Sequence, residues 1–444
     1  MNKCILTFIY ILISGINSNF LRQLQSSKSD FNYSNYNSIK SNEDLTGEKL
    51  SSSEVDQSVV YITNKGITIK DSSLIKESGN SSNIENSEFY GVNSAVLIQE
   101  GEATITGGEI VTKAQGANAL CATNGGTVQI SKTSIKSINT KQARGFLASY
   151  GGTIIANEVS ILTQGESCAS LATDRGRGQV TCTGCILMTE GLGSPLIYST
   201  GTIIVNGKTS GTASGAQMVI VEGRNTVSLS NSDLKCSGVG RKNVDNCGVM
   251  IYKSHSGNST NEGSSFHCKS STMEIESSSD VYSSAPMFFI TNTNTEINLN
   301  ECTFTYGSGV FLNIASTSDW GKSGENGGNV TLNLVNQNIE GDFSVDAISG
   351  LVINMVNSTI RGAINKAKTA DKLEIVMDSN SKIILNGNSY YTNLINSNNN
   401  SDSINKGDYD FESYNPEDIK DIRKTSASIN QISLLLFILM IFSF

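Results

Sequence analysis

Ala122-Thr-Asn-Gly-Gly-Thr-Val-Gln-Ile130 recurs 26 positions later as Ala148-Ser-Tyr-Gly-Gly-Thr-Ile-Ile-Ala156. Two more copies follow, Ala172-Thr-Asp-Arg-Gly-Arg-Gly-Gln-Val-Thr-Cys182 and Tyr198-Ser-Thr-Gly-Thr-Ile-Ile-Val205, and an earlier copy runs from Ile98 to Ile105. The anchor positions 98, 122, 148, 172 and 198 give a period of about 25 residues. Such a period predicts a solenoid, because one unit cannot bury its apolar face alone and must stack on its neighbours.

Apolar residues alternate with polar ones inside each unit, and the apolar positions fall into three columns. The first contains Val128, Ile154, Val180, Ile203, Val227, Met273 and Ile297; the second Ile130, Ala156, Cys182, Val205, Leu229, Ile275 and Leu299; the third Ile135, Ile161, Leu187, Leu234, Val281 and Phe304. A period of 2 with one apolar face predicts half-buried strands. Gly-Gly, Asn-Gly and Ser/Asn clusters interrupt the runs as turns do.

We therefore predict an all-β fold, a right-handed parallel β-helix with about 25 residues and about three strands per rung. With about a dozen rungs, it is expected to cover residues 59–394. Two polar insertions lengthen the period between Cys236 and His267, and beyond Gly327 the unit shortens to about 22 residues.

Both ends of the chain resemble targeting segments. Residues 1–18 have the weakly basic start and apolar stretch of a signal peptide. Residues 19–58 are a Ser/Asn-rich low-complexity segment, and residues 395–428 form an Asn/Ser-rich and then acidic stalk. The uncharged apolar segment 429–444 fits a GPI-anchor signal, with a single C-terminal transmembrane anchor as the alternative. Both alternatives predict the extracellular face of the plasma membrane.

Cysteine content agrees with a secretory compartment. Nine cysteines are present, and loss of Cys4 with the signal peptide would leave an even number, which favours disulfides. The expected local bridge joins Cys236 to Cys247, which bracket the first insertion. Cys182-Thr-Gly-Cys185 has CxxC spacing without a second ligand pair, so a core thiol or a disulfide is favoured over a metal site. Six Asn-x-Ser/Thr sequons are glycosylation candidates: Asn32, Asn80, Asn258, Asn329, Asn357 and Asn399.

The formal net charge of −9 argues against a nucleic-acid partner. No pattern of residues indicates a cofactor or a metal. The expected partners are extracellular glycans or other surface ligands, together with a membrane held through the C-terminal anchor.

The segment from about Ala95 to Leu394 resembles the adhesin-like parallel β-helix repeat proteins of microbial cell surfaces, a branch of the pectin-lyase-like superfamily. The resemblance is carried by the Ala/Tyr-Thr-x-Gly-Gly-Thr-Val/Ile-x-Ile units, by Val249-Met-Ile-Tyr-Lys-Ser254, by Phe288-Phe-Ile-Thr-Asn-Thr293 and by Asp319-Trp-Gly-Lys-Ser-Gly-Glu-Asn-Gly-Gly-Asn329. It implies a surface protein that binds ligands or carbohydrates. The bias toward Asn, Ile, Lys and Ser with a GPI-like tail suggests an AT-rich microbial eukaryote.

No complete catalytic pattern is present, so we expect a binding protein and assign no catalytic residue. A polysaccharide lyase or hydrolase of the same fold is the alternative, and an ice-binding solenoid is a second one, since Thr127, Thr153, Thr202 and Thr226 share a column. Asp174, Arg175 and Arg177 lie in a lengthened turn and could bind a sugar carboxylate, although an ion pair of Asp174 with Arg175 within the turn is the favoured interpretation. The single tryptophan, Trp320, could stack on a sugar ring or be buried as a cap.

Overall fold

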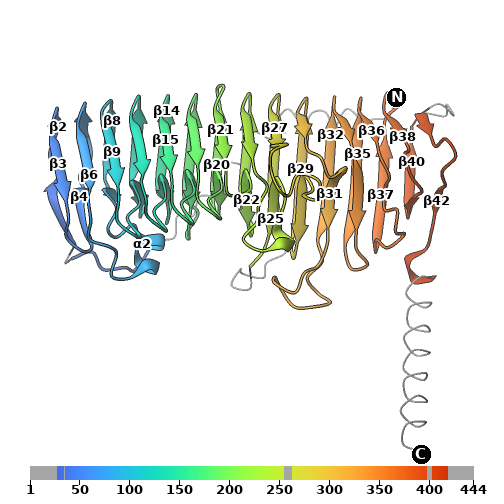
Figure 1. Cartoon of the computed structure of the whole chain (residues 1–444), viewed down its shortest axis with the longest axis horizontal. Helices are drawn as coiled ribbons and strands as arrows, with labels where there is room; N and C mark the ends of the chain where they lie inside the picture. Colours follow the sequence, from blue (N-terminus) through green and yellow to red (C-terminus); the bar gives the residue numbers. More distant parts are fainter. Residues whose placement is uncertain (1–27, 35, 255–262, 398–402, 419–444) are drawn as a thin grey trace, which may run out of the picture. The chain divides into compact units, whose positions relative to one another are not determined.

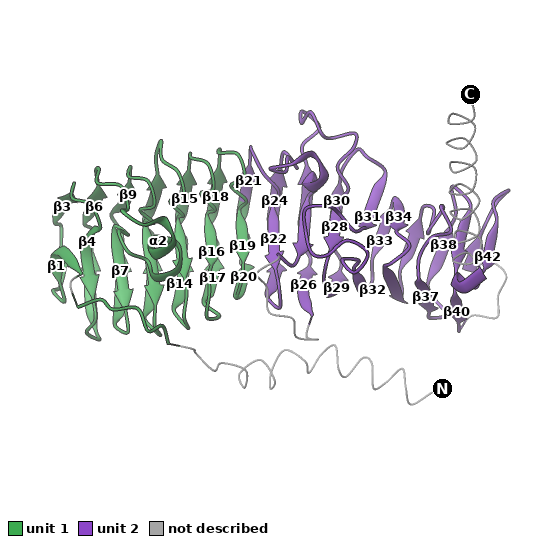
Figure 2. Ribbon diagram, turned by 90° about the horizontal axis from the view of Figure 1, so that it is seen from below, with its two compact units in different colours: residues 1–210 green, residues 211–444 purple. Residues whose placement is uncertain are grey.

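The structure is a computed structural model that describes residues 28–34, 36–254, 263–397 and 403–418. Nearly all of its secondary structure is strand, and every strand pair between named strands is parallel. Strands lie side by side with strands one repeat away, as expected of a parallel β-helix (Figure 1). Two compact units divide the chain after Ser210 (Figure 2).

Unit 1 contains three parallel sheets, here called sheets A, B and C, and each repeat contributes one strand to each sheet. Sheet A contains β1 (Asn37–Ser41), β4 (Gln57–Ile62), β7 (Val96–Gln99), β10 (Leu120–Thr123), β13 (Phe146–Ala148), β16 (Leu171–Thr173) and β19 (Ile197–Ser199). Sheet B contains β2 (Leu45–Thr46), β5 (Ile67–Lys70), β8 (Glu102–Thr106), β11 (Thr127–Ser131), β14 (Thr153–Asn157), β17 (Gln179–Thr183) and β20 (Thr202–Asn206). Sheet C contains β3 (Lys49–Ser52), β6 (Ser73–Lys76), β9 (Glu109–Thr112), β12 (Ser134–Ser137), β15 (Ser160–Thr163) and β18 (Ile186–Thr189). The boundary between the units falls within β21 (Ser210–Ala213).

Unit 2 continues the pattern and then changes it. Its sheet A strands are β22 (Val219–Glu222), β25 (Val249–Tyr252), β28 (Phe288–Thr291), β31 (Val310–Ile314) and β34 (Asp342–Val345). Its sheet B strands are β23 (Thr226–Ser230), β26 (Ser264–Lys269), β29 (Asn294–Asn300), β32 (Asn329–Val335), β35 (Gly350–Val356), β37 (Lys372–Met377) and β40 (Asn393–Asn396). Sheet C ends with β24 (Asp233–Cys236), β27 (Thr272–Ile275) and β30 (Thr303–Thr305). Two small sheets follow: β33 (Asn338–Glu340), β36 (Thr359–Arg361), β38 (Lys382–Ile384) and β41 (Ile404–Asn405), then β39 (Ser389–Tyr391) with β42 (Phe411–Ser413).

The predicted columns of unit 1 stack in register inside the helix. Val128 pairs with Ile154, which pairs with Val180 and through it with Ile203, and all four side chains are buried. The second column pairs in the same way: Ile130, Ala156, Cys182 and Val205. The alternation in the sequence therefore identifies the interior face of sheet B correctly.

The last two anchors of the repeat, Ala172 and Tyr198, are displaced by one residue. Ala148 pairs with Thr173, whereas Ala172 pairs with Leu147 and with Tyr198. Successive side chains of a strand point to opposite faces, so this shift places Ala172 on the outer face of sheet A. There it packs in a buried cluster with Leu97, Cys121 and Leu147.

Three assignments in unit 2 are wrong because the repeat lengthens there, from about 25 residues to 39 between Val227 and Phe266, while each rung still contributes strands to sheets A, B and C in the same order. Met273 and Ile275 lie on β27 in sheet C, where Met273 pairs with Leu234 and Phe304. The residues that continue the two sheet B columns are Phe266 and Cys268, which pair with Val227 and Leu229. Val281 lies in a turn and not in a strand. The expected shortening of the later repeat is confirmed, since Asn329 pairs with Gly350 and Gly350 pairs with Lys372.

Strands also occur outside the expected range 59–394. β1, β2 and β3 form a complete rung within the segment expected to be low complexity, and β41 and β42 lie within the expected stalk. The residues of β1 to β3 show no copy of the Gly-Gly turn, so the repeat could not reveal them from the sequence.

The Gly-Gly turn has a steric cause. It joins sheet A to sheet B, and its second glycine lies against a carbonyl oxygen of the preceding rung. A Cβ atom at Gly152 would lie 2.0 Å from the oxygen of Ala122, and one at Gly126 would lie 2.4 Å from that of Ile98. Neither approach can accommodate a side chain.

One short helix, α2 (Ile84–Tyr90), interrupts the strands between β6 and β7. The side chain of Asn83 accepts a hydrogen bond from the backbone N–H of Asn86, and Gly91 ends the helix in the left-handed conformation (φ 75°). Both are standard capping features of a helix. α2 brings Glu88, Phe89 and Tyr90 to the region of Arg144, Tyr150 and Arg175 of unit 1.

Candidate ligand-binding site

The turn between β16 and β17 holds three of the residues that the sequence analysis selected. Arg175 and Arg177 are exposed, whereas Asp174 is buried. The Asp174 carboxylate accepts a hydrogen bond from the backbone N–H of Arg175 (2.9 Å). The guanidinium of Arg175 lies over the ring of Phe89, 4.0 Å from its centroid, in cation–π geometry.

The ion-pair partner of Asp174 is a residue that the sequence analysis did not consider. Nη2 of Arg144 lies 3.3 Å from Oδ2 of Asp174 and 3.5 Å from Oε1 of Glu88. Because both oxygens contact one nitrogen, they lie no more than about 7 Å apart, and glycosidase carboxylates are separated by about 5–9.5 Å. Among the described residues, Nη1 of the same buried arginine has no hydrogen-bond partner.

Three aromatic rings stack beside this ion cluster. Phe31 and Tyr90 are parallel with centroids 4.3 Å apart, and Tyr90 and Tyr150 are parallel at 5.5 Å. The three side chains are half-buried, so parts of their rings face solvent. Tyr150 lies in the turn of the rung next to Arg175, since its backbone N–H donates to the carbonyl oxygen of Arg175 (2.7 Å).

Phe31 belongs to a segment, Lys28 to Tyr36, that crosses the outer face of sheet A and is here called the strap. The strap is held by hydrogen bonds from Ser29 N to Asn124 Oδ1 (3.0 Å) and from Tyr33 Oη to the carbonyl oxygen of Tyr90 (2.7 Å). Tyr33, Tyr36 and Tyr61 pack on the cluster of Leu97, Cys121 and Leu147. Burial raises the pKa of Tyr61 to about 12 and raises the pKa of Tyr33 and Tyr36 further. These phenols therefore remain neutral at physiological pH.

Some of these residues could have been found from the sequence. Asn83 followed by Ile84-Glu-Asn-Ser-Glu-Phe-Tyr-Gly91 contains both helix-capping signals and places the acidic Glu88 next to two aromatic residues. Arg144 gave no local signal, because its partners are 30 and 56 positions away in the chain and meet it only through the stacking of rungs.

Trp320 lies in unit 2, where it is half-buried and acts partly as a cap. Its ring packs against Met250, Tyr252 and Phe289 on the outer face of sheet A. The indole N–H donates to Oδ1 of Asp245 (3.4 Å). Burial raises the pKa of the Asp245 carboxyl.

The expected disulfide between Cys236 and Cys247 is wrong. Both side chains are buried free thiols, as are those of Cys121 and Cys168. Burial raises the pKa of Cys236 to about 12 and that of Cys247 further, and the neighbouring Cys236 adds to the shift at Cys247. The insertion between them places the two residues close together without joining their sulfurs.

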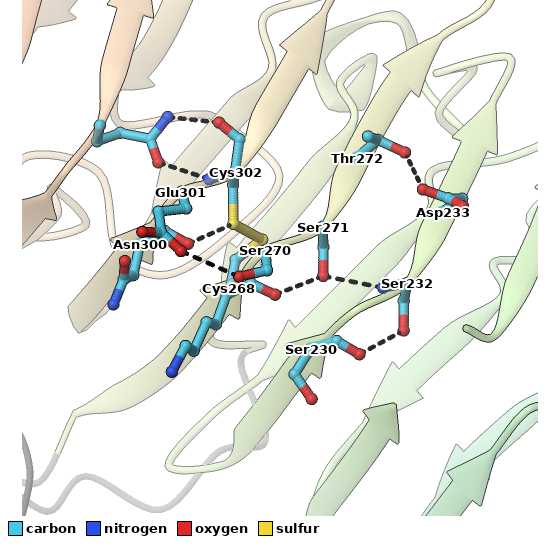
Figure 3. Close-up of a disulfide and its surroundings, with 12 residues drawn as sticks. Ser230, Ser232, Asp233, Cys268, Ser270, Ser271, Thr272, Asn300, Glu301 and Cys302 are labelled. Atoms are coloured by element: carbon cyan, nitrogen blue, oxygen red, sulfur yellow. Dashed lines mark hydrogen bonds between the residues drawn. A yellow bond between two sulfur atoms is a disulfide. The ribbon is translucent and has the colours of Figure 1, made fainter. Parts of the chain in front are cut away.

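Two other disulfides are present. Cys182 is bonded to Cys185 (Cα–Cα 6.1 Å), so the CxxC sequence forms a structural bridge across one corner. Cys268 of β26 is bonded to Cys302 (Cα–Cα 6.5 Å), as Figure 3 shows. The second bridge joins adjacent rungs of unit 2, because β26 pairs with β29 and Cys302 follows β29.

Four of the six sequons lie in described residues, and each asparagine is exposed: Asn32, Asn80, Asn329 and Asn357. Asn357 occupies a corner with φ 46°, and its Nδ2 donates to Asn336 Oδ1 (2.8 Å). Asn258 and Asn399 lie outside the described residues, as do residues 1–18 and 429–444.

The threonine column that suggested ice binding is interrupted. Thr127 pairs with Thr153, but the next residue of this column is Gln179, followed by Thr202. The neighbouring outward column of Thr104, Gln129, Ile155 and Thr181 is also mixed. A regular array of threonines is therefore not formed on this face of unit 1.

Within the described part of the chain, no helix is both long enough and apolar enough to cross a membrane. The same residues contain no group of three or more His, Cys, Asp or Glu side chains placed to hold a metal ion.

Comparison with protein-family models, with curated proteins and with solved structures found no match.

Proposed function

We propose that the chain is a surface-displayed β-helical protein of the adhesin-like, pectin-lyase-like type that binds glycans or other surface ligands without cleaving them. The observation that carries this proposal is the row of three stacked rings, Phe31, Tyr90 and Tyr150, beside the exposed Arg175 and Arg177. Aromatic faces pack on the C–H faces of sugars, and guanidinium groups bind carboxylates in two-pronged hydrogen bonds. The site thus combines an apolar platform with cationic donors, which suits an acidic glycan.

Binding of the protein to a glycan array tests this function. We expect binding to acidic glycans, and we expect Arg175→Ala and Tyr150→Ala each to weaken it about tenfold, since a charge-assisted hydrogen bond or a stacked ring contributes roughly 1–3 kcal/mol. Arg361→Ala on β36 is the matched control, because it removes another exposed arginine in unit 2. Absence of binding on the array, or equal binding by all three variants, would refute the proposal.

A polysaccharide hydrolase is the second candidate, favoured by one observation. Glu88 and Asp174 converge on one arginine nitrogen, which places two carboxylates close together as glycosidases require. Against it, both carboxylates are paired with the same arginine and are mostly withdrawn from solvent, with side-chain exposures of 23% and 12%. Release of reducing ends from acidic polysaccharides that is lost in Asp174→Asn and in Glu88→Gln would establish this alternative.

The placement at a cell surface rests on the two terminal segments of the sequence. Phospholipase treatment of intact cells should release the protein if residues 429–444 direct a GPI anchor. Retention after treatment, with Phe444 still detected by mass spectrometry, would indicate a transmembrane anchor instead.

A further inference from the structure

Two loops of unit 2 meet over the outer face of sheet A at Trp320. One loop follows β24 and contains the short helix η1 (Asn243–Asp245); the other joins β31 to β32. The rings of Trp320 and Tyr252 are 4.6 Å apart and inclined by 57°, so they form two walls of a corner. This pair of rings is here called the aromatic corner.

A cation already lies at the aromatic corner. Nζ of Lys242 is 5.7 Å from the centroid of Trp320, within the distance at which an ammonium group is attracted to an aromatic face. The same nitrogen is 2.8 Å from Oδ1 of Asp319. The lysine side chain is 55% exposed, so it can leave this position without disturbing the core.

Both rings of the corner donate hydrogen bonds to carboxylates. Asp245 accepts from the Trp320 indole, and Glu222 accepts from the hydroxyl of Tyr252 (2.9 Å). Asn326 is 1% exposed and donates to the carbonyl oxygen of Trp320 (2.7 Å), yet its Oδ1 has no partner among the described residues. Thr291, which pairs with Tyr252 in the next strand, is fully buried and its hydroxyl also has no partner there.

We propose that the aromatic corner binds an organic ammonium group and that Lys242 occupies the place of this ligand in the unbound protein. Aromatic faces together with carboxylates are the chemistry that recognises substituted ammonium ions. Asn326 and Thr291 add two buried acceptors that lack partners among the described residues, and they lie next to Trp320 and Tyr252 respectively. This site belongs to unit 2 and does not depend on glycan binding by unit 1.

The single tryptophan makes the test direct, because intrinsic tryptophan fluorescence reports on Trp320 alone. We titrate the protein and its variant Lys242→Ala with tetramethylammonium chloride and with methylammonium chloride, at constant ionic strength set by sodium chloride. We expect a saturable change in fluorescence with both ions, at a midpoint at least tenfold lower in Lys242→Ala than in the unaltered chain. Lys235→Ala is the matched control, since it removes another half-exposed lysine of unit 2, and it should behave as the unaltered chain does.

tert-Butanol serves as a neutral probe of similar size. A response of Lys242→Ala to tert-butanol equal to its response to tetramethylammonium would show an apolar pocket and overturn the proposal. An unsaturable response to both ions would overturn it as well. The variant Tyr252→Leu, which keeps the reporter, should lose the saturable response if the corner binds the ion; circular dichroism verifies that each variant is folded.

Discussion

Lys76, the last residue of β6, is completely buried in unit 1. Its amine donates to the carbonyl oxygens of Gln57 (2.8 Å) and Glu54. Burial lowers the pKa of this amine to about 8, although Asp56 and Glu54 oppose the shift. These hydrogen bonds from the buried amine to backbone oxygens hold the loop after β3 to the sheet. Because the pKa of the amine differs between the folded and unfolded states, the stability of unit 1 depends on pH.

The sign of this dependence follows from linkage. Between pH 8 and the ordinary lysine pKa, the unfolded state keeps a proton that the folded state has lost, so Lys76 contributes stability that rises with pH. We expect the unfolding free energy of the unaltered chain, relative to Lys76→Met, to increase by about 2 kcal/mol from pH 8 to pH 10. The buried thiols and tyrosines act in the opposite direction, and they cancel in this difference. Urea unfolding of both proteins at several pH values measures this difference in unfolding free energy. A difference that does not change with pH would contradict a lowered pKa of Lys76.

The reactivity of the four described free thiols is a second test of individual residues. They are Cys121, Cys168, Cys236 and Cys247, all buried, and burial raises the pKa of each. Reactive thiols are exposed and ionised, so iodoacetamide should not modify these cysteines in the folded protein. After denaturation without reductant, mass spectrometry of residues 28–418 should show four alkylated cysteines. Fewer than four would reveal additional disulfides.

An ion cluster contributes to the attachment of α2 to the rungs of unit 1. Arg144 joins Glu88 of the helix to Asp174 of the turn after β16. Arg144→Met would remove the cation that Glu88 and Asp174 share, and removing one partner of a largely buried ion pair costs about 3–5 kcal/mol. We expect the unfolding free energy of unit 1, measured by urea denaturation, to decrease by this amount.

Arg361→Ala is the control for this change as well, since exposed positions usually shift stability by less than about 0.5 kcal/mol. If Arg144→Met destabilises the protein no more than Arg361→Ala does, the ion cluster does not secure α2.

The strands of sheet B were predictable because their information is local and repeated. Val128, Ile154, Val180 and Ile203 each alternate with polar neighbours, and each follows a turn with the same glycine requirement. The displacement at Ala172 was not predictable in this way, because alanine fits either face of a strand. The candidate site was recognised only in part: Asp174, Arg175 and Arg177 share a turn, but the partners of Asp174 come from distant rungs.

At the scale of the whole chain, each rung contacts mainly its neighbours, and a disulfide between rungs closes a longer loop than a disulfide within one rung. The Cys268–Cys302 bridge closes a loop of 34 residues, whereas Cys182–Cys185 closes a loop of 3. In the chain-entropy model these loops correspond to about 4 and about 2 kcal/mol. Cys302→Ser, compared with Cys185→Ser by thermal denaturation of residues 28–418, should therefore lower the midpoint more. Equal midpoints would show that loop entropy does not govern the stability of this helix.

The strap also constrains the order in which parts of unit 1 fold during synthesis. Ser29 is bound by Asn124, which is synthesised 95 residues later, and translation at roughly 5–20 residues per second takes about 5–20 s to cover that distance. The first rungs can stack during this interval, since each needs only the rung before it, but Phe31 and Tyr33 have no surface to dock on until Tyr90 and Asn124 have emerged. The strap is thus synthesised before the rungs up to β10 but docks after them. A nascent chain halted before residue 124 would leave Phe31 and Tyr33 exposed and available to chaperones.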